Sequence, residues 1–233
     1  EGGNSSLQAK LQVSGTDFSS SAINLQRYQN NASAAAIAFN KSRNGTQGSH
    51  TILQDGDELG KIIFYGSDGN DFQNEGARIT SKVDGTPGNN VMPGSLISQT
   101  TPQGAVGSSE RLRITKTGRV LIQEGTFSER TLGVAAKLQI EGTNAPTSTI
   151  SVVRNSNDTN PSYIHFGKSR GTATGANTIL QTGDSIGGLF FYGADGNDIY
   201  SESAFIRAGI ATGRTQATTT VGSDSVPGVI EFA

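Results

Sequence analysis

Residues 39–71 read FNKSRNGTQGSHTILQDGDELGKIIFYGSDGND, and residues 166–198 read FGKSRGTATGANTILQTGDSIGGLFFYGADGND. The two stretches align without a gap at a shift of 127 residues and are identical at 19 of 33 positions. The same shift places Lys10-Leu11-Gln12-Val13 on Lys137-Leu138-Gln139-Ile140. A period of this length exceeds the roughly 20 to 50 residues of solenoid coils, so it predicts tandem domains along an axis.

The second copy of the repeat stops before it is complete. Pro93-Gly94 matches Pro227-Gly228 only if the second copy carries seven extra residues, which we place in a loop. The first copy continues through residues 110–122, which have no counterpart before Ala233. We expect a natural polypeptide that continues past Ala233. Its predicted parts are a linker at 1–9, a first β domain at 10–123, a linker at 124–136 and an incomplete second β domain at 137–233.

Short apolar patterns predict strands along most of the chain. Five segments alternate apolar with polar residues, which is the pattern of a half-buried strand. Their apolar pairs are Leu11 and Val13, Ile23 and Leu25, Ile37 and Phe39, Ile150 and Val152, and Ile164 and Phe166. The sequence therefore predicts an all-β fold, as tandem β-sandwich-like or interlaced β domains.

Two further patterns are typical of sheets. Residues 111–115 and 119–122 flank Lys116-Thr117-Gly118 and predict a hairpin in which Gly118 adopts a positive φ. Continuous apolar runs at residues 62–65 and 189–192 are typical of strands covered on both faces. In a chain with so little core, we expect the second cover to be another subunit.

The composition supports a folded but core-poor chain. Only 33% of the residues are hydrophobic, 16% are charged and 31 are glycine. Such a chain gains stability by burying surface against copies of itself, so we expect an obligate oligomer. A net charge of −2 without blocks of like charge argues against a nucleic acid or an anionic membrane as partner. The absence of Cys excludes disulfides, and no apolar stretch is long enough to span a membrane.

One short polar motif is the same in both copies and is our candidate ligand-contact turn. It reads Asp68-Gly69-Asn70-Asp71 in the first copy and Asp195-Gly196-Asn197-Asp198 in the second. These residues are first of all those of a β-turn, because short polar side chains bond the local backbone while Gly and Asn accept positive φ. The carboxylates could also hold a divalent ion or a sugar hydroxyl.

Three other motifs suggest ligand chemistry, and each has a structural interpretation that we prefer. Asp55-Gly56-Asp57 resembles the start of a calcium loop, but the twelfth position is Gly66 and the second copy has Thr182 for the first Asp, so we predict a turn. Lys41-Ser42-Arg43, repeated as Lys168-Ser169-Arg170, could form an anionic-ligand rim, a solvated strand end or an inter-subunit ion pair. Arg111 and Arg113 predict a polar outer face on the hairpin.

No catalytic arrangement recurs between the copies. His50 and His165, which are the two histidines, align with Asn177 and Ala38. The sequence has no phosphate-binding Walker loop, no GxSxG nucleophile motif and no HExxH metal motif. We predict that the protein is not an enzyme and uses no metal or cofactor.

An ordered series of four motifs resembles the repeat unit of bacteriophage tail fibres and related virion proteins. The motifs are Gly60-Lys61-Ile62-Ile63-Phe64-Tyr65-Gly66-Ser67-Asp68-Gly69, Gly76-Ala77-Arg78-Ile79, Met92-Pro93-Gly94-Ser95-Leu96 and the hairpin from Glu110 to Ile122. The resemblance implies a homotrimeric, β-rich fibre component of the virion, extracellular, that carries attachment to the host cell. The implied partners are other tail or baseplate proteins and a host surface glycan or protein receptor.

The resemblance leaves other functions open within and beyond this class. The domains could themselves recognise glycans, or belong to a tailspike that depolymerises capsule. A capsid-decorating fibre and a repetitive bacterial adhesin are further structural alternatives.

Overall fold

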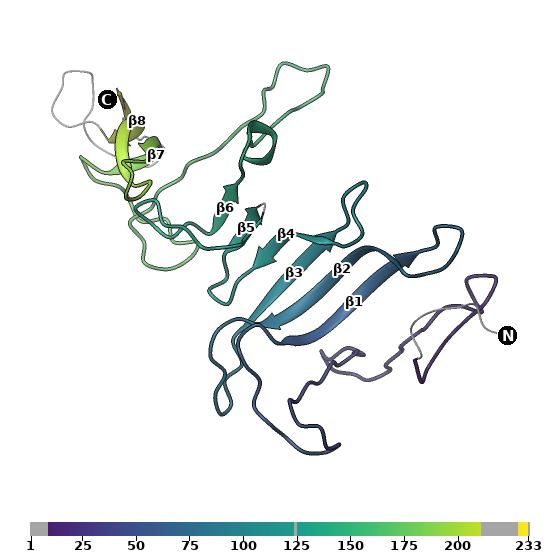
Figure 1. Ribbon diagram of the computed structural model, residues 1–233. Coiled ribbons are helices and arrows are strands. Elements are labelled where there is room, and N and C mark those ends of the chain that lie inside the picture. The colour runs from purple at the N-terminus through teal and green to yellow at the C-terminus, as the bar shows by residue number, and fades with distance from the viewer. Residues whose placement is uncertain (1–8, 124, 211–227, 233) are drawn as a thin grey trace. The chain divides into compact units, whose positions relative to one another are not determined.

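The computed structural model describes residues 9–123, 125–210 and 228–232, and in this part of the chain the fold is all-β. The strands of this part of the chain form a six-stranded sheet and a three-stranded sheet (Figure 1). Two compact units divide the chain. The first comprises residues 1–129 with 136–149, and the second comprises residues 130–135 with 150–233. No helix among the described residues is long and apolar enough to cross a membrane.

The six-stranded sheet is an antiparallel meander with one parallel strand added at its end. Its strands, in spatial and chain order, are β1 (Glu58–Gly66), β2 (Asn74–Val83), β3 (Gly94–Thr100), β4 (Ser109–Ile114), β5 (Val120–Gln123) and β6 (Leu138–Glu141). The predicted hairpin is confirmed as β4–β5, and Gly118 in its turn has a φ of 73°. Strand β6 pairs with β5 in parallel.

The three-stranded sheet repeats the start of the first. It contains β7 (Ser185–Gly193), β8 (Ser201–Ile210) and β9 (Gly228–Phe232), and a single 3₁₀ turn, η1 (Ala145–Thr147), precedes it in the chain. The β1–β2 pairing shifts register after Glu58 and after Phe64. The β7–β8 pairing shifts after Ser185 and after Phe191, which are the same positions of the repeat. The repeated sequence therefore specifies the irregularities of the pairing as well as the strands.

The five alternating segments do not form strands, so that prediction was wrong. Residues 11–13, 23–25, 37–39, 150–152 and 164–166 belong to no sheet, and their apolar side chains are exposed. Alternation of apolar and polar residues indicates that one face of an extended segment is suited to burial. A strand also needs a neighbouring backbone that forms hydrogen bonds with its N–H and C=O groups. The described part of the chain provides no such neighbour for these segments.

Each unit has a small core where its first strand begins. Leu53 and Val83 are buried in the first unit, and Leu180 and Ile210 occupy the same positions of the repeat in the second. A backbone hydrogen bond joins the turn that follows each Leu to the end of the second strand: the amide of Gly56 donates to the carbonyl of Val83 over 2.9 Å, and that of Gly183 donates to the carbonyl of Ile210 over 3.2 Å. The first unit adds Ile97 and Leu121, whose side chains are each 1% exposed.

The predicted domain limits remain a prediction. Strand β6 opens the predicted second domain at 137–233, yet it completes the first sheet. Most of the predicted linker at 1–9, residue 124 of the second linker, and the predicted insertion within 211–227 lie outside the described residues.

Candidate functional site

One face of the six-stranded sheet is apolar and uncovered. Cross-strand pairing aligns Ile62 with Ile79, and Leu96 with Ile114. We define the apolar face of the first unit by the exposed side chains Ile62, Phe64, Ile79, Leu96, Ile114, Ile122 and Leu138. Among the described residues nothing covers this side of residues 62–65, for which we predicted a cover from another subunit: Ile62 is 49% exposed and Phe64 is 54% exposed.

The opposite face of this sheet holds buried side chains. Thr80, Ile97 and Leu121 are buried there at adjacent positions of the sheet. Arg113, which lies between Ile97 and Leu121 in the register, donates two hydrogen bonds to Glu110 over 2.6 and 2.8 Å. A soluble single-layer sheet normally presents its polar face to water and buries its apolar face. Here the face that carries the charged side chains contains the buried Thr80, Ile97 and Leu121.

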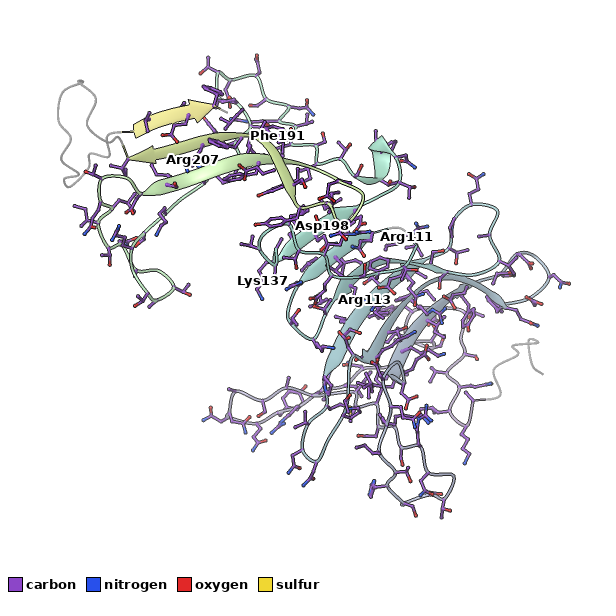
Figure 2. All side chains as sticks on the ribbon, turned by 60° about the vertical axis from the view of Figure 1, so that its left-hand side comes forward. Arg111, Arg113, Lys137, Phe191, Asp198 and Arg207 are labelled. Atoms are coloured by element: carbon purple, nitrogen blue, oxygen red, sulfur yellow. The ribbon has the colours of Figure 1, made fainter. Side chains whose placement is uncertain are left out.

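The second unit has the same apolar face at the same positions of the repeat. Leu189 pairs with Ile206, which pairs with Phe232, and Phe191 lies opposite Ala204. The exposed members are Leu189, Phe191, Ile206, Ile230 and Phe232. Figure 2 labels Phe191 and Arg207 on this sheet. On its other face Arg207 lies over the ring of Phe205, 5.3 Å from the ring centre, and donates to Glu231 over 2.9 Å.

A groove of about 360 Å³ opens on the apolar face of the first unit. Phe39 lies at one side of it and packs on Gly60: a β-carbon at Gly60 would lie 2.5 Å from the Phe39 β-carbon. Phe166 packs on Gly187 in the same way, at 2.6 Å. The connecting segment is therefore fixed to its own first strand by a ring on a glycine in both units.

The candidate ligand-contact turns use their carboxylates to shape the backbone. Asp68 accepts hydrogen bonds from the amides of Asn70 and Asp71 over 2.8 and 3.2 Å, and Asp71 accepts from the amide of Gln73 over 2.8 Å. The bonds from these amides lower the pKa of Asp68. Gly69 has a φ of 96°, which a turn at this position requires.

The second turn has the same geometry. Asp195 accepts from the amides of Asn197 and Asp198, and these bonds lower its pKa. Asp198, labelled in Figure 2, accepts from the amide of Tyr200 over 2.8 Å. Both turns need the same hydrogen bonds from side chain to backbone, which explains why the two motifs have the same sequence. Ligand contact by Asp68, Asn70, Asp71, Asp195, Asn197 and Asp198 remains a prediction.

The repeated Lys-Ser-Arg motif forms an intrachain clamp. Arg43 donates two hydrogen bonds to Asp57 over 2.6 and 2.7 Å, and Arg170 donates two to Asp184 over 2.7 Å each. The Arg43 guanidinium holds the pKa of Asp57 far below its usual range, and Arg170 does the same for Asp184. Each carboxylate also accepts a backbone amide, from Gln54 or Gln181. Because each arginine already donates two hydrogen bonds to its own carboxylate, the motif is engaged within the chain and does not form a rim for an anionic ligand.

The same contacts explain the segment that resembles a calcium loop. Asp57 is engaged by Arg43, and Asp55 accepts from the amide of Gly85 over 2.6 Å. Gly56 has a φ of 83°, as a turn requires. In the described ranges, no cluster of three or more His, Asp or Glu side chains could hold a metal ion.

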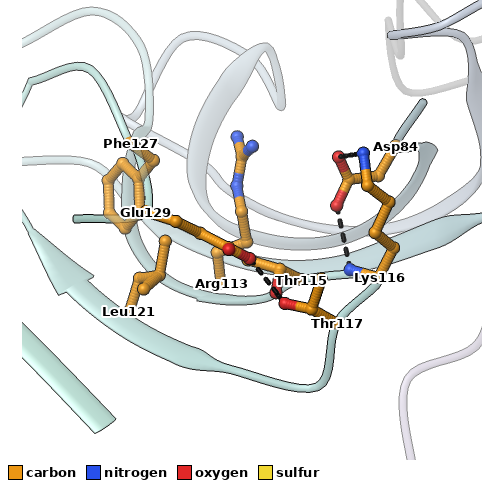
Figure 3. A pocket seen from close by; sticks show the side chains of 8 residues that line it. All are labelled: Asp84, Arg113, Thr115, Lys116, Thr117, Leu121, Phe127 and Glu129. Atoms are coloured by element: carbon orange, nitrogen blue, oxygen red, sulfur yellow. Dashed lines mark hydrogen bonds and ion pairs between the residues drawn. The ribbon is translucent and has the colours of Figure 1, made fainter. Parts of the chain in front are cut away.

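The hairpin borders a polar hollow of about 210 Å³, shown in Figure 3. Its charged groups form ion pairs within the chain. Lys116 lies 3.5 Å from Asp84, and Arg119 lies 2.6 Å from Glu129. A hydrogen bond from the Thr117 hydroxyl to Glu129 over 2.6 Å lowers the pKa of Glu129. This hydrogen bond braces the turn of the hairpin against the following loop.

Arg111 and Arg113, labelled in Figure 2, lie on β4, and both donate hydrogen bonds to other residues of the chain. Arg111 donates to the Thr100 hydroxyl over 3.0 Å. Arg113 pairs with Glu110 and lies over the ring of Phe127, 5.6 Å from its centre. The polar face predicted for this hairpin is therefore partly covered by its own loop.

The two contacts that sequence reasoning missed both leave a signal in the repeat. Arg43 and Asp57 recur as Arg170 and Asp184, and each pair is separated by 14 residues. The Phe39 and Gly60 pair also recurs unchanged, as Phe166 and Gly187. Residues that are retained together in both copies could have been proposed as partners.

Comparison with known proteins gives likeness at the level of the fold. No protein-family model matches the sequence, and no curated protein matches it. The structure is similar to the carboxy-terminal domain of the L-shaped tail fibre of bacteriophage T5, with a TM-score of 0.63 and 13% identity over 91% of this chain and 82% of that one. It matches equally well a second structure, in which the same domain is present together with its intramolecular chaperone domain, and it covers 56% of that longer chain. The chain therefore has the all-β fold of a bacteriophage tail fibre domain.

Proposed function

We propose that this chain is a segment of a bacteriophage tail fibre, in which three copies assemble into a rigid arm for attachment to the host cell. The observation that carries the proposal is the uncovered apolar face that recurs in both units. The likeness to a tail fibre domain supports the same assignment. The number of copies rests on the resemblance of the sequence motifs to trimeric fibre repeats.

The chemistry of the apolar face favours another copy of the chain as its cover. Its side chains are mainly aliphatic, so they offer no hydrogen bond to a sugar or a charged ligand. Burying one half-exposed Ile or Leu stabilises an assembly by about 1 kcal/mol, and the first unit alone presents seven such apolar side chains. Because the face recurs at equivalent positions, one kind of packing can cover both units.

The strand edges support the same proposal. Strand β1 lies at one end of its sheet and β7 at one end of the other, so each has an edge without a partner among the described strands. Open edges and uncovered apolar faces together are aggregation hazards in a monomer. A closed homo-oligomer removes both hazards.

The proposed mechanism is mechanical. Several arms on one virion, each with weak receptor contacts, gain avidity because binding of the first arm raises the effective concentration of the others. In this function the protein is extracellular, assembles with other tail or baseplate proteins and catalyses no reaction. The exposed turns at residues 68–71 and 195–198 are our candidates for contact with a host glycan or protein.

The test is the mass of the full chain in solution, measured by light scattering, before and after a charge is placed on the apolar face. We expect a trimer for the unaltered chain and monomers for Ile79→Lys. Val106→Lys is the matched control, because Val106 is an equally apolar β-branched residue that is 95% exposed in a loop. A monomeric unaltered chain, or an Ile79→Lys variant that stays trimeric, would contradict the proposal.

A further inference from the structure

We propose that residues 10–13 are a junction strand that joins one repeat unit to the unit before it in a fibre. The partner that fits them is a β-hairpin of the kind formed by β4 and β5, supplied by another repeat of this type. The proposal concerns how units are linked along one chain, so it does not depend on the number of chains in the fibre.

The first observation is that these residues recur as a strand whose pairing is known. Lys137-Leu138-Gln139-Ile140 repeats Lys10-Leu11-Gln12-Val13, with Ile140 for Val13 as the one change. In the structure Leu138, Gln139 and Ile140 lie in β6, in parallel register with Val120, Leu121 and Ile122 of β5. The copy that follows a hairpin therefore pairs with it.

The second observation is that the contacts of Lys137 with the hairpin can be made by Lys10 of the earlier motif. The amide of Val120 donates to the carbonyl of Lys137 over 2.8 Å. The Lys137 ammonium donates to the carbonyl of Thr117, in the hairpin turn, over 3.0 Å. Lys10 carries the same ammonium group, and the Lys10 carbonyl can accept the same amide.

The third observation is that the local structure after the motif is also repeated. Asp17 accepts from the amide of Ser20 over 2.8 Å, and Asn144 accepts from the amide of Thr147 over 3.3 Å at the same position of the repeat. Gly15 and Gly142 both lie at a close approach: a β-carbon on either would lie 2.0 Å from a side-chain hydroxyl. The two motifs therefore enter the same turn, with the same restriction on the preceding strand.

The fourth observation is the difference in pairing. Residues 10–13 belong to no strand among the described residues, and Leu11 is 76% exposed against 55% for Leu138. In the described ranges, β6 follows the β4–β5 hairpin and pairs with it, whereas no hairpin of this kind precedes residues 10–13.

The experiment places that hairpin before residues 10–13 in the natural spacing. A lengthened chain consists of residues 1–137 followed directly by residues 11–233, so that the second occurrence of Leu11-Gln12-Val13 follows a complete hairpin and residues 124–137. Amide hydrogen exchange is measured by mass spectrometry on peptides that span the Lys137-Leu11 junction, which occurs once in the lengthened chain.

In the 233-residue chain, we expect residues 11–13 to exchange roughly tenfold or more faster than residues 138–140. In the lengthened chain, we expect the junction copy of 11–13 to slow to within about threefold of residues 138–140. Fast exchange of the junction copy beside protected residues 138–140 would overturn the proposal. Equal protection of both segments in the 233-residue chain would also overturn it, because a different partner would then cover residues 11–13.

A second variant covers the case in which the lengthened chain does not fold. Ile140→Val in the 233-residue chain converts β6 into the motif of residues 10–13. We expect residues 138–140 to keep their protection to within about tenfold, because the register and the backbone bonds are unchanged. Loss of the protection of this strand would show that the motif cannot pair with such a hairpin, and would overturn the proposal.

Discussion

The two sheets begin with the same strand pairing, but they differ in what covers the face opposite the apolar face. Both units have the Phe on Gly contact, the Arg and Asp clamp and the small core at the start of the first strand. The first unit continues into β4 and β5 and buries Ile97 and Leu121. The described part of the second unit ends at β9 and buries only Leu180 and Ile210 among its large apolar residues.

This difference separates two sources of stability. The contacts shared by both units are local and join segments less than 30 residues apart. The additional core of the first unit depends on the hairpin and on the loop that follows it. The apolar face is uncovered in both units, so the hairpin does not replace the cover that we assign to other copies.

The largest effect is expected from a change in the core that the second unit lacks. Leu121→Ala should lower the free energy of unfolding of the first unit by about 3 kcal/mol, because truncating a side chain that is only 1% exposed leaves a cavity. Denaturant unfolding measures the loss, and hydrogen exchange should localise it to β3, β4 and β5. The control is Leu25→Ala, at an exposed position outside the sheets. Equal destabilisation of β7 and β8 would mean that the units do not unfold separately.

A smaller effect should be common to both units. Gly60→Ala and Gly187→Ala should each cost about 2 kcal/mol, because the new methyl group would overlap Phe39 or Phe166. Gly66→Ala and Gly193→Ala are matched controls at the ends of the same strands, where a β-carbon meets no atom within 4 Å. Thermal unfolding of the four variants checks the expectation. A loss at Gly60 without one at Gly187 would show that the two units are not built alike.

The smallest effect should come from the Arg and Asp clamp, because water screens an exposed ion pair. Arg43 and Arg170 lower the pKa of Asp57 and Asp184 below the ordinary value of 3.8, so each carboxylate stabilises the fold above that pH. This stability declines as the pH falls below about 4, because the carboxylates are then protonated in the unfolded chain while the arginines keep them ionised in the fold. Asp57→Asn and Asp184→Asn should therefore lower the melting temperature most at pH 7, and the loss should become smaller as the pH falls toward about 2. An effect that persists in acid would point to a lost hydrogen bond instead of a lost charge.

Much of the fold followed from the repeat and from turn chemistry. Gly118 and the flanking alternation predicted the β4–β5 hairpin because a tight turn with a positive φ requires glycine. The runs at residues 62–65 and 189–192 predicted two of the strands. The Asp-Gly-Asn-Asp turns were found as turns, and their predicted role in ligand contact is untested.

The segments that were wrongly predicted as strands show the limit of such reasoning. Ile37 and Phe39 alternate as a strand would, but Phe39 packs on Gly60 and Ile37 is exposed. The side-chain pattern of an extended segment does not specify which backbone lies beside it. The clamp of Arg43 on Asp57 was missed for the same reason, since pairing across a loop depends on the path of the loop.

The sequence by itself determined that the protein is all-β, that it is built from a repeat of 127 residues, and where its tight turns lie. These properties are local: glycine and short polar residues restrict the backbone wherever they occur. Only the tertiary structure decided which face of the six-stranded sheet holds its buried side chains and which strand pairs with which. Those properties depend on contacts between distant segments, and here they reveal a sheet whose charged face is covered and whose apolar face is left for other copies.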